Sequence, residues 1–111
     1  MAFQTIVPNQ LGQAAIGTPV STLYTVPAST RTFLKDMDIC NTTPAPILVS
    51  IFIVPSPGAA GPGNALMYNA QVPGNSTVQW SGSQVMPTGA TLQAQASSAG
   101  ITITASGGEA T

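Results

Sequence analysis

Residues 90–97, with the sequence ATLQAQAS, alternate strictly between apolar and polar side chains. A second alternating stretch, ITITAS, follows at residues 101–106. A period of two residues directs apolar side chains to one face of a β-strand and polar side chains to the other. The intervening Ser98-Ala99-Gly100 has the composition of a turn, so the two stretches predict a β-hairpin.

The same period recurs upstream, where Phe33, Met37 and Ile39 share one predicted strand face while Asp36 and Asp38 share the other. Segments rich in proline, glycine and asparagine separate such stretches at roughly the 8–12-residue spacing typical of sandwiches and barrels. We therefore predict an all-β fold. Its form is an antiparallel, jelly-roll-like β-sandwich of about eight strands.

The N-terminal residues 1–18 are less regular than the rest of the chain, and two interpretations are open. In the first, they form an irregular N-terminal arm that crosses to a neighbouring subunit and contacts it through Phe3, Ile6 and Val7. In the second, they form an edge strand followed by a loop. In both cases residues 19–111 make up a single β-sandwich domain.

The segment ILVSIFIV, residues 47–54, is almost entirely apolar. A strand of this composition is buried on both faces. Either it lies centrally in the fold, or its outer face is covered by another subunit. We favour the second interpretation, in which Leu48, Phe52 and Val54 form an apolar contact surface.

Charged residues are scarce in this chain. They make up 5% of the sequence, against roughly 25% in an average domain, and the net charge is −1. The charged residues are Arg31, Lys35, Asp36, Asp38 and Glu109. Neutral polar groups can be buried at an interface without the desolvation cost of ions. The composition therefore favours a protein that is covered by copies of itself or by a larger assembly.

The same composition argues against several other classes of function. Two basic residues cannot neutralise the phosphates that nucleic-acid binding requires, and they make no cationic patch for a membrane surface. No apolar run reaches the roughly 20 residues of a membrane-spanning helix, and the start of the chain shows no secretory signal. We expect no nucleic-acid partner, no membrane partner and no cofactor.

Catalytic chemistry has little support in the sequence. The chain has no histidine, which removes the commonest general base, and its single cysteine, Cys40, provides neither a disulfide nor a zinc site. We interpret Cys40 as a buried thiol. Asp36 and Asp38 have three interpretations: a solvated face balanced by nearby cations, a weak calcium site, or a glycosidase pair. The first is favoured, and in its functional version these carboxylates pair with another subunit. We therefore predict that the protein is not an enzyme and binds no metal.

The aromatic side chain best placed for binding a carbohydrate is Trp80, with Asn75 and Gln79 nearby. Trp80 also alternates in phase with Val78, which favours packing in the core.

Several strand ends and turns together resemble small β-sandwich virion structural proteins of tailed bacteriophages. The matching pieces are residues 23–28 (LYTVPA), 30–31 (TR), 39–42 (ICNT), 53–55 (IVP), 64–68 (NALMY), 92–94 (LQA) and 99–103 (AGITI). The resemblance covers about residues 23–110. It implies a virion component that is made in the cytoplasm of the host bacterium, and it carries over no catalytic residue.

From the composition and the resemblance together, we expect a capsid decoration, cement or head-accessory protein. It would form a homo-oligomer, with a trimer favoured, and bind major capsid protein or other virion proteins. The candidate contact residues are Phe3, Ile6, Val7, Leu48, Phe52 and Val54 for affinity, and Arg31, Lys35, Asp36 and Asp38 for register. The alternative is a tail- or fibre-associated module that binds carbohydrate on the host, for which Trp80 would be exposed.

Overall fold

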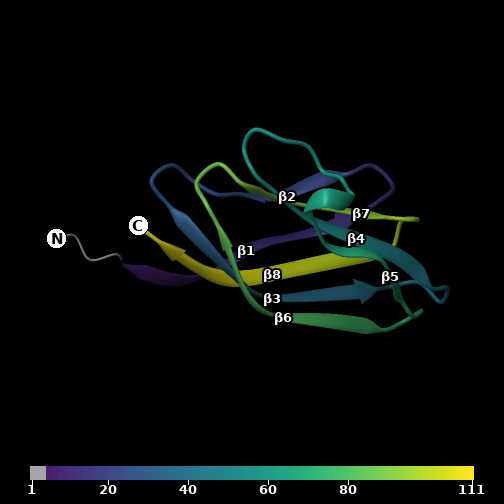
Figure 1. Ribbon diagram of the computed structural model, residues 1–111. Helices are drawn as coiled ribbons and strands as arrows, with labels where there is room; N and C mark the ends of the chain where they lie inside the picture. Colours follow the sequence, from purple (N-terminus) through teal and green to yellow (C-terminus); the bar gives the residue numbers. More distant parts are fainter. Residues whose placement is uncertain (1–4) are drawn as a thin grey trace.

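The computed structural model describes residues 5–111, which form eight β-strands in two four-stranded sheets (Figure 1). The strands are β1 (Ile6–Ile16), β2 (Ser21–Thr25), β3 (Arg31–Asn41), β4 (Ile47–Val54), β5 (Ala65–Val72), β6 (Thr77–Met86), β7 (Thr91–Ala96) and β8 (Ile101–Ala110). A single 3-10 turn, η1 (Pro62–Asn64), precedes β5. All strand pairs are antiparallel, which confirms the predicted fold class.

The strand order is that of a jelly roll. One sheet has the order β1-β8-β3-β6, and the other has the order β2-β7-β4-β5. The first strand therefore pairs with the last, the second with the seventh, the third with the sixth and the fourth with the fifth. This nested pairing folds one long antiparallel ribbon over itself into two facing sheets.

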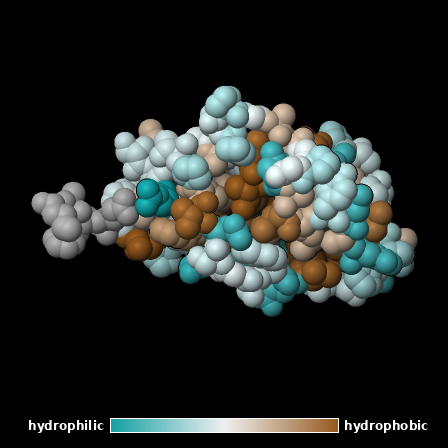
Figure 2. Space-filling view, in the orientation of Figure 1, coloured by the Kyte–Doolittle hydropathy of each residue, from teal (hydrophilic) through white to brown (hydrophobic). Residues whose placement is uncertain are grey.

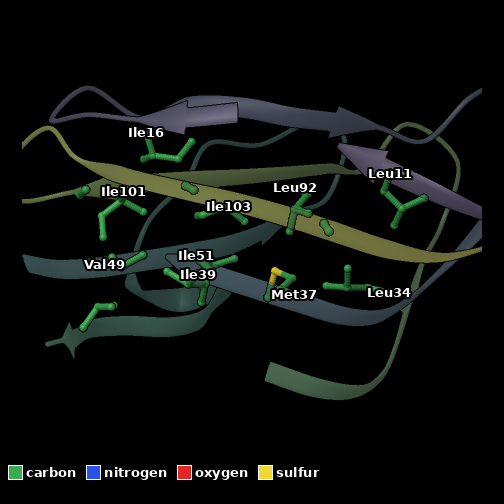
Figure 3. Close-up of a cluster of buried hydrophobic side chains, with 14 of the residues drawn as sticks. Leu11, Ile16, Leu34, Met37, Ile39, Val49, Ile51, Leu92, Ile101 and Ile103 are labelled. Carbon is green, nitrogen blue, oxygen red and sulfur yellow. The ribbon is translucent and has the colours of Figure 1, made fainter. Parts of the chain in front are cut away.

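The core lies between the two sheets and is built from the alternating positions (Figure 3). Leu92 and Ala94 of β7 and Ile101, Ile103 and Ala105 of β8 are fully buried, as their period of two residues predicts. The two sheets thus bury their apolar faces against each other.

The connection between β7 and β8 is not the predicted hairpin. The two strands belong to opposite sheets, so residues 97–100 cross from one sheet to the other. Gly100 has a φ of +121°, which suits the glycine found there. Alternation in the sequence identifies which face of a strand is buried, but it does not identify the strand with which it pairs. The hairpin prediction failed for this reason. Among consecutive strands, β4 and β5 form a hairpin.

The prediction that another subunit covers the outer face of β4 is wrong for two of its three residues. Strand β4 lies centrally, between β7 and β5, and both Phe52 and Val54 are buried within the chain at 3% and 2% exposure. The chain covers them itself. Gly58 of the β4–β5 loop lies against Val54, with its Cβ position 3.6 Å from Cγ1, and the ring of Tyr68 meets that of Phe52 edge-on at 6.5 Å.

The N-terminal segment is regular over residues 6–16, where the expected alternatives were an irregular arm and an edge strand. Strand β1 pairs with β8 along this whole length and forms an edge of its sheet (Figure 1). Phe3 lies outside the described residues. Across residues 5–111, no helix has the length and apolar character needed to cross a membrane.

Candidate functional site

A β-bulge in β3 decides which side chains lie on the outer face of the β1-β8-β3-β6 sheet. The register of β3 with β8 shifts between Leu34 and Asp36, so β3 has one extra residue there. Leu34 and Met37 both point into the core, and the two residues between them, Lys35 and Asp36, both lie on the outer side. Because the bulge reverses the alternation, Phe33 also lies on the outer face, and its predicted place beside Met37 is wrong.

The bulge brings the four predicted register residues onto one face. Arg31 and Lys35 lie toward the start of β3, while Asp36 and Asp38 lie toward its end, so the two signs of charge are separated along the strand. Lys35 Nζ donates to Ser83 Oγ at 3.4 Å, and Gln79 Nε2 donates to Asp36 Oδ1 at 3.0 Å. Both contacts are made with neutral side chains on β6.

The cationic half of this face contains an apolar hollow of about 260 Å³. It is lined by Ile6, Phe33, Lys35, Ser83 and Gly108. These residues come from all four strands of the sheet, and Phe33 is in direct register with Gly108 on one side. A Cβ at Gly108 would lie 3.0 Å from Cγ2 of Ile6, so the glycine leaves room for Ile6 to lean across the strand. Ile6 itself is 60% exposed.

The anionic half of the face is polar and otherwise neutral. Strand β8 contributes Thr102, Thr104 and Ser106, and β1 contributes Gln13, whose Nε2 donates to Thr104 Oγ1 at 3.1 Å. Cys40 lies at the end of this half, opposite Thr102, and is half-buried rather than buried as predicted. Figure 2 shows, on the side in view, a surface made mostly of side chains of intermediate hydropathy with apolar groups between them.

The other predicted contact residues are not part of this face. Val7 is 53% exposed but pairs with Glu109, on the opposite side of β1 from Ile6. Leu48 is 42% exposed and belongs to the other sheet. The structure therefore unites Ile6 with the four charged residues and separates them from Val7 and Leu48.

A second polar cluster, which the sequence analysis missed, links the two sheets. Tyr24 of β2 donates its phenol proton to Glu109 Oε2 of β8 at 2.5 Å, and its Oη lies 2.7 Å from Oγ1 of the buried Thr32. Asn9 Nδ2 donates to the other carboxylate oxygen of Glu109 at 2.9 Å. Finding this cluster requires the strand order, because Tyr24 and Glu109 are far apart in sequence and their pairing leaves no local signal.

The electrostatics of this cluster follow from its hydrogen bonds. Burial and the bond to Glu109 raise the pKa of Tyr24 to about 12. The bonds from Tyr24 and Asn9 hold the pKa of the Glu109 carboxyl below its ordinary value. The cluster thus favours a neutral phenol donating to an ionised carboxylate. The cluster is a structural link between the sheets.

Trp80 lies on the inner side of the edge strand β6, where it is half-buried and packs against the core together with Val78. Its indole contacts Gly82, since a Cβ there would lie 3.2 Å from the ring. This packing does not favour an open platform for a sugar ring. Within residues 5–111, no group of three or more candidate metal ligands comes together.

Comparison with known proteins bears on the fold alone. No family model and no curated protein matches the sequence. Three similar solved structures are those of the infectious bursal disease virus Gx strain, of the T13 particle of the same virus and of its VP2 subviral particle. Their TM-scores are 0.55, 0.54 and 0.52, their identities are 13%, 12% and 12%, and the alignments cover 97%, 96% and 96% of this chain.

The aligned region is 31%, 30% and 32% of those three chains, so this chain spans about a third of their length. These neighbours are particle proteins of infectious bursal disease virus and not tailed-bacteriophage proteins. The similarity therefore shows a shared jelly-roll architecture.

Proposed function

We propose that this chain is a non-enzymatic structural component of a virus particle. The observation that carries the proposal is that the fold of almost the whole chain aligns with part of proteins solved as virus particles. Jelly rolls also occur in lectins and cupins, so the fold alone does not decide the function.

The surface of the chain supplies the second argument. An outer sheet face that is rich in threonine, serine and glutamine around one apolar hollow can be covered at a moderate desolvation cost. The four charges on that face are few enough to set orientation while neutral contacts provide the buried area. A protein that is covered by neighbouring subunits in a particle needs a face with a low desolvation cost.

In its more specific form, the proposal is a decoration, cement or head-accessory protein of a bacteriophage, made in the host cytoplasm and bound to major capsid protein. Repetition over a closed shell would multiply a weak single contact into stable attachment, because each bound copy raises the effective concentration of the next contact. A homo-oligomer fits this role, and the trimer expected from the sequence stays a prediction.

Co-sedimentation tests the proposal. The purified chain is mixed with empty heads of the phage that carries its gene, and the pelleted amount is measured against the concentration of free chain. A particle component pellets to saturation at a fixed ratio to the major capsid protein. A chain that stays in the supernatant at every concentration, and that is absent from purified particles by mass spectrometry, contradicts the proposal.

A further inference from the structure

We propose that the outer face of the β1-β8-β3-β6 sheet docks on the same face of a second copy of this chain. The two copies of β3 run antiparallel across the contact, around a two-fold axis that passes between Lys35 and Asp36. The proposal rests on the proposed function in that it names one contact by which copies meet in a particle. It can be tested on the isolated chain.

Charge complementarity indicates that the partner bound to this face is a second copy of the chain. Four of the chain's charged residues lie on this face, with Arg31 and Lys35 in one half and Asp36 and Asp38 in the other. The two-fold axis places the cationic half of each copy over the anionic half of the other. At about 3.3 Å per residue, Arg31 lies about 15 Å from the axis and Asp38 about 8 Å, a difference that a long arginine side chain spans.

The charges also select the orientation. A two-fold axis parallel to β3 would place Arg31 over Arg31 and Asp38 over Asp38, so like charges would oppose one another in both halves. The antiparallel arrangement converts these repulsions into attractions at the same positions. Charged groups at an interface act mainly in this way, by excluding wrong registers.

The uncharged part of the face suits the same arrangement. In the proposed dimer, the apolar hollow around Phe33 and Gly108 of each copy lies over the β8 segment of the other copy. That segment carries the neutral side chains of Thr102, Thr104 and Ser106. Threonine methyl groups can fill an apolar hollow, and none of these partners is an ion that must be dehydrated.

The area of the face is adequate for a weak dimer. Four strands spaced about 4.8 Å apart and about ten residues long make a face of about 600 Å² per copy. Two such faces bury about 1,200 Å² in total, at the lower end of the range of specific interfaces. The contact is therefore concentration-dependent in the isolated chain and gains strength when copies are held together in a shell.

Charge-reversal variants test this contact by sedimentation equilibrium of the whole chain. The variant R31E/K35E makes both halves of the face acidic, and the variant D36K/D38K makes both halves basic. Each alone should dimerise at least about tenfold more weakly than the wild type. An equimolar mixture of the two should form a heterodimer, and the fourfold variant, which keeps the wild-type net charge, should recover the wild-type affinity.

A matched control places charge elsewhere. The variant Q71E/Q95E adds two carboxylates to exposed positions of the other sheet and should leave dimerisation unchanged. Circular dichroism confirms that each variant is folded. A wild-type chain that stays monomeric up to about 1 mM, or a mixture that fails to associate while every variant is folded, overturns the proposal. Co-sedimentation of R31E/K35E with phage heads then shows whether the chain still binds the particle without this contact, which separates the proposed function from the proposed dimer.

Discussion

The phenol of Tyr24 donates a 2.5 Å hydrogen bond to Oε2 of Glu109, and this bond ties one sheet of the jelly roll to the other. Tyr24 belongs to β2 and Glu109 to β8, so the bond holds the two sheets together beyond the apolar core. Thr32 and Asn9 complete the cluster from β3 and β1.

Removal of either partner of this bond should destabilise the fold. Tyr24→Phe leaves the Glu109 carboxylate without one donor and should lower the free energy of unfolding by about 1.5–3 kcal/mol, the range for a hydrogen bond to a charged group. Urea denaturation measures the change. Tyr68→Phe, at a position 56% exposed, is the matched control and should leave stability within about 0.5 kcal/mol of the wild type. Equal effects of the two substitutions would contradict the role given to Tyr24.

The same bond predicts how stability depends on pH. The pKa of Glu109 is lower in the folded chain than its ordinary value of 4.5, so its stabilising contribution is present above that value and is lost as the pH falls through the folded pKa. The pKa of Tyr24 is raised from 10.0 to about 12, so its contribution is complete below pH 10 and is lost as the pH rises toward 12. Urea midpoints measured across pH should fall at both ends. Tyr24→Phe should remove its share of the alkaline fall, and an unchanged alkaline fall in that variant would be evidence against this assignment.

The burial of Phe52 within the chain, where its ring meets that of Tyr68, predicts a large difference between two apolar residues of β4. Phe52→Ala empties a site that is 3% exposed and should cost about 3–5 kcal/mol. Leu48→Ala changes a side chain that is 42% exposed and should cost about 0.5 kcal/mol or less. Thermal or urea unfolding distinguishes the two. Similar small losses would mean that Phe52 lies on the surface.

Close strand packing at Gly107 predicts intolerance to any side chain there. A Cβ at this position would lie 1.9 Å from the carbonyl oxygen of Phe33, so Gly107→Ala must displace the backbone of β3. We expect a loss of about 1–3 kcal/mol or more. Gly61→Ala, where no atom lies within 4 Å of the added Cβ, is the control and should be nearly neutral. A folded Gly107→Ala variant of wild-type stability would contradict the strand spacing described here.

The features that the sequence predicted are those encoded locally. Alternation correctly assigned Leu92 and Ile103 to the core, because the period of two residues fixes the buried face of a strand wherever that strand lies. The contact role that the near absence of charge suggests for the outer surface stays a prediction. The fold class follows from many such local signals that agree.

The features that the sequence did not predict depend on contacts between distant segments. The bulge at Lys35 reverses the face on which Phe33 lies, and the sequence around Lys35 gives no signal that predicts a bulge. The contact of Phe52 with Tyr68 depends on the pairing of β4 with β5, and the Tyr24–Glu109 bond depends on which strands of the two sheets face each other. Each requires the topology, which alternation does not contain.

The central claim, that this chain acts in a particle with its β1-β8-β3-β6 face covered, has a direct probe in the single thiol. Cys40 lies half-buried on that face, and the rate at which it reacts with a maleimide can be measured for the free chain and for the chain bound to phage heads. The account predicts that binding slows the reaction of Cys40, while a cysteine placed at Leu48 in a Cys40→Ser background stays reactive. An unchanged rate at Cys40 in the bound chain would contradict the account.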